Sequence, residues 1–216
     1  MIISWGGGVN STAIIALHLL GELKGKPEIV FADTGCEYPE TYAYINTVGN
    51  MLIRKDWKVK VLRPWVNPEY YSPQVVRNET VYKYCFNAKT IPLRRWKICT
   101  DKFKVKPLKR YANGRKRLVG ICKDEWHRAF MDDTTQIFPL KDYTRDGCAW
   151  LVGKAGLPIP HKTGCWCCYA LKKQEWIDMY DNRPELWKEC VELESNSKTK
   201  YRTGITLEEQ IKKWQS

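Results

Sequence analysis

Short apolar runs alternate with longer amphipathic segments between residues 2 and 62 of the chain. Residues 2–4, 29–32 and 59–62 have the length and composition of buried strands, whereas 11–23 and 41–52 carry apolar side chains at helical spacing. Strands that alternate with helices favour a parallel sheet with right-handed crossovers. The chain is therefore predicted to adopt a Rossmann-like, doubly wound α/β fold with a mainly parallel sheet, followed by a Cys-rich C-terminal helical part.

A glycine cluster, Gly6-Gly7-Gly8, separates the first expected strand from the first expected helix. Glycine allows positive φ, so successive amide N–H groups can face one point, and the following helix adds its unpaired first-turn amides and the positive end of its dipole. Ser11 or Thr12 is expected to cap that helix and to donate a hydroxyl to a phosphate oxygen. The loop has neither the lysine of a Walker A motif nor Gly-x-Gly-x-x-Gly spacing. We therefore predict a pyrophosphate or sulfate site here.

The net charge of +12 is concentrated between residues 94 and 117, where basic side chains far outnumber acidic ones. Such a field attracts phosphates, either of a nucleotide or of a nucleic-acid backbone. Basic residues at 94–97 and the aromatic residues of 82–86 also resemble the mixture that single-strand binders use. A solvated helix face beside core aromatic residues is the simpler interpretation of the same pattern.

Residues 4–12 resemble the PP-loop, Ser-Gly-Gly-x-Asp-Ser, with Gly6 in place of the first Ser and Asn10 in place of the Asp. Further stretches follow in the order typical of proteins similar to phosphoadenosine-phosphosulfate (PAPS) reductase. They are 31–41, 95–107, 120–128 and 139–168. Over residues 2 to 176 the chain thus resembles the PAPS reductase-like family of the PP-loop, or adenine nucleotide alpha hydrolase-like, superfamily. The likeness is greatest to its short members carried by phages and mobile elements.

The resemblance implies that an adenine nucleotide, either ATP or the sulfonucleotides APS and PAPS, binds beside the carboxyl ends of the strands. The implied nucleotide-binding residues are Ser4, Gly6, Gly7, Gly8, Asn10, Ser11, Thr12, Asp33, Thr34, Gly35 and Gly120. The implied catalytic residues are Asp33, Lys102, Asp124 and Arg128.

In this interpretation Asp124 or Glu125 holds Mg²⁺ through hard oxygen ligands, while Lys102 and Arg128 neutralise charge that builds up on the phosphates. Simpler roles remain open for the acidic residues: Asp33 could cap a turn, and residues 124–125 could form a solvated loop. His127 is open between a structural and a catalytic role.

Cys165-x-x-Cys168 has the spacing of two thiolates that chelate one metal centre. The resemblance implies Cys99 and Cys148 as the two further ligands, because each lies in a stretch similar to family motifs that contain Cys. Cys36, Cys122 and Cys167 are alternatives, and Cys85 and Cys190 are interpreted as ordinary buried residues. Related proteins imply a [4Fe–4S] cluster, with zinc or free reduced thiols as the alternatives.

Met1 leads directly into an apolar strand and leaves no room for a signal peptide, and no apolar run approaches the roughly 18 residues of a membrane span. We therefore expect a cytoplasmic protein that is not bound to a membrane. In that compartment the nine cysteines are more often thiols or metal ligands than disulfides.

Three functions compete. The first is ATP-dependent adenylation with pyrophosphate release, coupled to sulfur transfer by an iron–sulfur centre. The second is reduction of APS or PAPS, but the family's reductases use a Glu-Cys-Gly-x-His segment, and this chain has Lys188-Glu189-Cys190-Val191-Glu192. The third is a nucleotide- or nucleic-acid-binding module with a structural metal and no catalysis.

The expected partners are an adenine nucleotide, a tRNA or DNA acceptor, a sulfur donor protein and a second copy of the chain in a homodimer. We expect residues 1–176 to form the PP-loop nucleotide-binding domain including the Cys knuckle, and residues 177–216 to form a helical extension of the same unit.

Overall fold

The computed structural model describes residues 1–72, 79–93, 98–129, 133–202 and 204–215. In this part of the chain a five-stranded parallel sheet has the order β3-β2-β1-β4-β5. The strands are β1 (Ile2–Ser4), β2 (Glu28–Ala32), β3 (Val59–Leu62), β4 (Arg117–Val119) and β5 (Gln136–Ile137). The predicted Rossmann-like α/β fold is therefore confirmed.

The direction of winding reverses at β1. The chain first adds β2 and β3 on one side of β1 and then crosses back to place β4 on its other side. Loops that leave the carboxyl ends of β1 and β4 consequently diverge, and doubly wound sheets bind ligands in the crevice at such a point. The glycine cluster leaves β1 at this edge.

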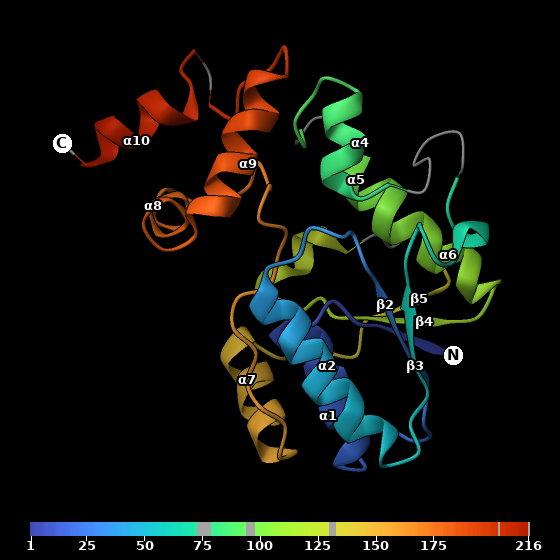
Figure 1. Cartoon of the computed structure of the whole chain (residues 1–216). Coiled ribbons are helices and arrows are strands. Elements are labelled where there is room, and N and C mark those ends of the chain that lie inside the picture. The colour runs from blue at the N-terminus through green and yellow to red at the C-terminus, as the bar shows by residue number, and fades with distance from the viewer. Residues whose placement is uncertain (73–78, 94–97, 130–132, 203, 216) are drawn as a thin grey trace.

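Helices cover both faces of the sheet (Figure 1). On one face Ile3, Ile29 and Phe31 pack into a core with the helices α1 (Val9–Leu19), α2 (Pro39–Ile53) and α7 (Arg145–Lys154). On the other face Ile2, Val30 and Leu62 pack into a second core. Side chains on a strand alternate between its two faces, so the continuous apolar run of each strand serves both cores.

The second core contains the helices between β3 and β4. They are the 3-10 helix η1 (Pro68–Tyr70), α4 (Val81–Asn87), α5 (Ile98–Thr100), the π-helix η2 (Asp101–Val105) and α6 (Lys106–Ala112). The sequence of residues 64–92 has no regular apolar spacing and predicts an irregular segment, but α4 forms there, and the Thr80 side chain caps it by accepting from the Lys83 amide. The sequence of residues 101–111 predicts a basic helix; it is present, but its first half is π-helical. Residues 94–97 lie outside the described part, so the interpretation placed on them stays a prediction.

The C-terminal helices α8 (Lys173–Asn182), α9 (Pro184–Ser195) and α10 (Leu207–Gln215) pack against the second core through Trp176, Cys190 and Leu207. The predicted boundary at residue 176 falls inside α8. Residues on both sides of that boundary share one core with Ile2 and Val30. None of the described helices is long and apolar enough to cross a membrane.

Candidate functional site

The loop between β1 and α1 presents a row of backbone amides. Gly7 has a φ of +70°, and Gly8 is the N-cap of α1. Within the described ranges, no acceptor is hydrogen-bonded to the amide N–H groups of Gly7, Gly8, Val9 and Asn10. These groups lie at the positive end of the α1 dipole, next to the point where the winding reverses. Unpaired amides at the positive end of a helix dipole are able to bind an anion, and the pyrophosphate or sulfate site predicted here stays a prediction.

Two hydroxyls hold this loop in shape. The Ser11 hydroxyl accepts from the Gly6 amide at 3.1 Å and donates to the Gly8 carbonyl at 3.1 Å. The Thr12 hydroxyl accepts from the Trp5 indole N–H at 3.0 Å. The prediction that Ser11 or Thr12 caps α1 was therefore wrong: Gly8 is the N-cap, and it makes no side-chain cap bond. Both hydroxyls lie inside the first turns of α1 and reach back into the loop.

Two glycines allow neighbouring segments to approach this loop. A Cβ atom on Gly120, in the loop that follows β4, would lie 2.7 Å from the backbone nitrogen of Ser11. A Cβ atom on Gly8 would lie 2.8 Å from the Thr163 hydroxyl, which belongs to the segment before Cys165. Gly120 was predicted to contact the nucleotide, and the structure gives it a packing role against the start of α1. The segments at 120 and 163 thus border the row of amides.

The 3-10 helix η3 (Lys123–Arg128) brings one carboxylate to the glycine loop. The side-chain nitrogen of Asn10, Nδ2, donates to Glu125 Oε2 at 2.9 Å, and Glu125 Oε1 pairs with Arg128 at 2.5 Å. Asp124 instead accepts from the Arg145 amide at 2.7 Å, at the start of α7. Of the two acidic residues considered for Mg²⁺, Glu125 therefore contacts the loop, whereas Asp124 anchors a helix.

Asp33 follows β2 and is only 2% exposed. Its carboxylate accepts from the Gly35 amide at 2.8 Å and the Tyr42 hydroxyl at 2.7 Å, and it pairs with Arg63 at 3.0 Å. Burial, and then the Asp33 charge, raise the pKa of Tyr42 well above its usual range. The turn-capping role considered for Asp33 is thus present, together with an ion pair. Arg63 was not predicted, although its place directly after β3 is where doubly wound sheets carry functional residues.

Glu37, Lys104 and Cys165 form a polar cluster beside Asp33. Glu37 Oε1 lies 2.9 Å from Lys104 Nζ, 3.1 Å from the Thr34 hydroxyl and 3.6 Å from Cys165 Sγ. Burial alone would lower the pKa of Lys104, but the Glu37 carboxylate outweighs it and raises that pKa. The predicted Lys102 points elsewhere, donating to the Tyr84 hydroxyl at 3.3 Å. Lys104 is therefore the lysine of this helix that reaches the loop after β2.

The four cysteines predicted as metal ligands do not come together. Cys148 is buried in the first core, where burial and then Cys122 raise its pKa to about 12. Cys99, Cys165 and Cys168 pack against the second core, on the other face of the sheet. In the described part of the chain, no three His, Cys, Asp or Glu side chains are arranged to hold a metal ion. The prediction of Cys148 as a ligand beside Cys165 was therefore wrong, and the four predicted residues do not fit a tetrathiolate centre.

The remaining predicted residues of the nucleotide site line the same edge. The Ser4 hydroxyl is buried and has no hydrogen-bond partner among the described residues. The Thr34 hydroxyl accepts from the Cys36 amide at 3.2 Å. Gly35 has a φ of +72°, and a Cβ atom there would lie 2.4 Å from Thr80 Cγ2. Thr34 and Gly35 thus shape the turn after β2, whereas Ser4 offers a free polar atom.

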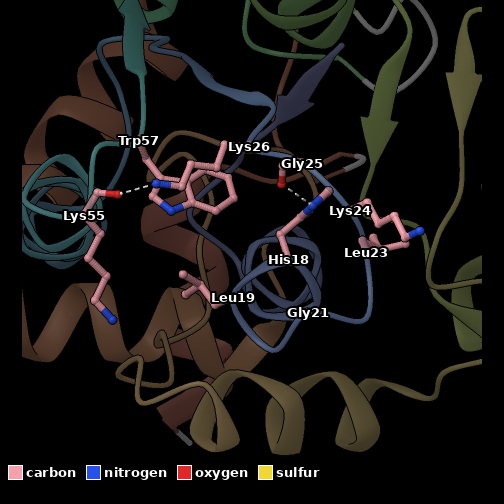
Figure 2. A pocket seen from close by; sticks show the side chains of 9 residues that line it. All are labelled: His18, Leu19, Gly21, Leu23, Lys24, Gly25, Lys26, Lys55 and Trp57. Atoms are coloured by element: carbon pink, nitrogen blue, oxygen red, sulfur yellow. Dashed lines mark hydrogen bonds between the residues drawn. The ribbon is translucent and has the colours of Figure 1, made fainter.

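A hollow of about 630 Å³ lies at the opposite end of α1 from the glycine loop. Figure 2 shows His18 and Trp57 among its lining residues, with the His18 imidazole directed at the Gly25 carbonyl, 3.0 Å away. Lys24, Lys26 and Lys55 give it a positive lining. It is therefore a second basic surface, remote from the row of amides.

His18 predicts how stability depends on pH. Burial lowers the pKa of His18 below 6.5 in the folded state, so the unfolded chain binds the proton more readily. Stability should therefore fall as the pH drops through the ordinary histidine pKa of about 6.5. We expect His18→Gln to reduce the loss in free energy of unfolding between about pH 7.5 and about pH 5.5, measured by urea denaturation. An equal loss in free energy of unfolding in the parent and in His18→Gln would show that His18 does not cause the pH dependence.

Comparison with known families agrees with this geometry. Residues 1–159 match the family model described as the phosphoadenosine phosphosulfate reductase domain. The matched region contains the whole described sheet, the glycine loop and η3, and it ends before the segment with Thr163 and Cys165. A search of curated proteins finds no match.

Proposed function

Because the chain belongs to the phosphoadenosine phosphosulfate reductase domain family, we propose that it binds ATP at the glycine loop and transfers the adenylyl group with release of pyrophosphate. The observation that supports this most is the row of unpaired amides from Gly7 to Asn10 at the reversal of winding. Four donors in a row suit the oxygens of a polyphosphate, because no hydrogen bond within the described chain is lost when they bind an anion.

The chemistry follows from where charge develops. An acceptor nucleophile attacks the α-phosphorus of ATP, and the bond from that phosphorus to the bridging oxygen of the β-phosphate breaks. The electron pair leaves with pyrophosphate, whose growing charge is stabilised by the loop amides and the α1 dipole. Arg128, whose side chain is 59% exposed and pairs with Glu125, adds a cation at the border of the loop for a phosphate to bind.

Mg²⁺ is the cation that accompanies such nucleotides, and the donors at the loop border fit it. Glu125 offers a carboxylate, and the Asn10 side-chain oxygen is buried without a partner among the described residues. Both are hard oxygen ligands of the kind Mg²⁺ prefers. Bound there, Mg²⁺ would neutralise phosphate charge. The cysteines predicted to hold an iron–sulfur cluster do not fit one centre, so no step is assigned to it.

The acceptor we propose is a polyanion such as tRNA or DNA, because a net charge of +12 favours binding to a phosphate backbone. Sulfur would then come from a separate donor protein. Adding tRNA or DNA to the assay of nucleotide products tests whether either polymer is the acceptor.

Reduction of a sulfonucleotide would need an accessible thiol, and Cys190 does not provide one. Its sulfur is buried, 3.7 Å from the Trp166 carbonyl and 3.8 Å from Met179 Sδ. Burial raises the pKa of Cys190 well above its usual range. We therefore expect Cys190→Ala to keep ATP-dependent pyrophosphate release within about twofold, at a cost of about 1 kcal/mol in stability. Release of sulfite from PAPS by the parent protein, abolished in a folded Cys190→Ala variant, would favour the reductase.

Product analysis tests the proposed function. The protein is incubated with ATP and Mg²⁺, with and without tRNA or DNA, and AMP, ADP, phosphate and pyrophosphate are quantified. A parallel sample receives PAPS and is analysed for sulfite. We expect AMP or an adenylated acceptor to appear in step with pyrophosphate, and no sulfite. Release of ADP and phosphate, or sulfite from PAPS, would contradict the proposal.

A further inference from the structure

The Asn10 side chain is buried, and only its nitrogen is hydrogen-bonded to a described residue. It occupies the place of the Asp in the PP-loop pattern and is 7% exposed. Its nitrogen donates to Glu125 Oε2 at 2.9 Å and to Cys122 Sγ at 3.3 Å, but its oxygen has no partner within the described ranges. A buried acceptor left unpaired costs about 1–3 kcal/mol, so such an atom calls for an explanation, and a ligand that completes it is one.

Glu125 is held in place from several directions. Its two carboxylate oxygens are bound by Asn10 and Arg128, and its amide donates to the Cys122 carbonyl at 3.0 Å. The neighbouring Asp124 ties the same 3-10 turn to the start of α7. The Glu125 backbone, at φ −115° and ψ 15°, departs from helical geometry within η3. This carboxylate is therefore positioned at the loop by the fold.

We propose that Glu125 supplies the carboxylate that position 10 lacks, that Asn10 positions it, and that the two oxygens together bind the divalent cation of a metal–nucleotide complex. The inference rests on the proposed function and deepens it. The PP-loop pattern carries its negative charge on the Asp at the position of Asn10, whereas this chain carries it on Glu125 in the adjacent η3.

The electrostatics explain why the two positions depend on each other. An Asp at position 10 beside Glu125 would bring two carboxylates within hydrogen-bond distance, and like charges that close cannot both ionise freely. An Asn avoids that repulsion and still offers an oxygen, while its nitrogen satisfies Glu125. The charge should therefore be exchangeable between positions 10 and 125.

Three variants test this exchange, with Mn²⁺ as the probe. We would measure Mn²⁺ binding by electron paramagnetic resonance in the presence of ATP, and ATP affinity without metal by calorimetry. Glu125→Gln should weaken Mn²⁺ binding by at least about tenfold, and the double variant N10D/E125Q should recover to within about threefold of the parent. Asp124→Asn is the matched control, because its side-chain oxygen can still accept from the Arg145 amide and keep the turn in place while a neighbouring carboxylate is removed, so Mn²⁺ binding should stay within about twofold of the parent.

The outcomes separate this inference from the proposed function. Unchanged Mn²⁺ binding in Glu125→Gln, no recovery in the double variant, or an equal loss in Asp124→Asn would overturn the inference while metal-free ATP binding persists. Failure of the parent protein to bind ATP at all would overturn the proposed function and the inference with it.

Discussion

Replacing Gly120 with alanine is expected to lower ATP affinity by at least about tenfold, which corresponds to about 1.4 kcal/mol. The new Cβ atom would lie 2.7 Å from the Ser11 nitrogen and 2.8 Å from its Cα, and neither backbone atom can rotate away. The loop after β4 and the start of α1 must then separate, which misaligns the open amides. Overpacking of this kind also costs about 1–3 kcal/mol in stability. Calorimetry with ATP and urea unfolding measure the two effects.

Gly164→Ala is the matched control for Gly120→Ala. A Cβ atom on Gly164 meets no atom within 4 Å, and its φ is not positive, so neither packing nor backbone strain opposes the change. We expect parental ATP affinity in this variant. Indistinguishable affinities for the Gly120 and Gly164 variants would show that the close approach of these two loops is not needed to bind the nucleotide.

Glu37→Ala is expected to destabilise the fold by about 2–3 kcal/mol, because it removes one partner of a largely buried ion pair. The Glu37 side chain is 1% exposed and that of Lys104 is 35% exposed, so solvent moderates the cost of the charge left behind. The Thr34 hydroxyl also loses the carboxylate that it donates to. Burial, and then the Glu37 charge, raise the pKa of the Cys165 thiol, which donates to that carboxylate at 3.6 Å, so Cys165 should react faster with a thiol reagent in the variant.

The exposed pair of Asp101 and Lys106 provides the control for Glu37. Its atoms lie 2.6 Å apart, but the side chains are 43% and 55% exposed. Exposed pairs contribute about 0–1 kcal/mol, so Asp101→Ala should change the free energy of unfolding by no more than that. If Glu37→Ala cost no more than Asp101→Ala, the Glu37 cluster would not be a structural tie between the loop after β2 and the cysteine segment.

The local elements of the sheet could be predicted from the sequence because each has its own signal. The strands at 2–4 and 59–62 were predicted at their observed bounds. The sequence could not show that Lys104, and not Lys102, reaches Glu37 in the loop after β2. Residues two apart on a helix face different directions, and the π-helical turn at 101–105 changes which of them points toward Glu37.

Motif order could not show which cysteines meet. Cys148 and Cys165 lie close in the chain and in stretches that resemble one family, which suggested a common centre. Yet α7 packs against α1 on one face of the sheet, and the segment after it returns to the other face, where Trp166 pairs with Cys36. Only the tertiary packing decides this. Asp124 and Glu125 are adjacent in the chain, so only the geometry of η3 shows that Glu125 contacts Asn10 and Asp124 contacts α7.

The most direct test of the central claim is a titration of ¹⁵N-labelled protein with ATP, followed by amide resonances. We predict that the largest shifts occur at Gly7, Gly8, Val9 and Asn10, whose N–H groups have no hydrogen-bond partner among the described residues. The basic hollow around Lys24, Gly25 and Lys26 is the competing anion surface. Shifts confined to that hollow, with the glycine loop unchanged, would contradict the account.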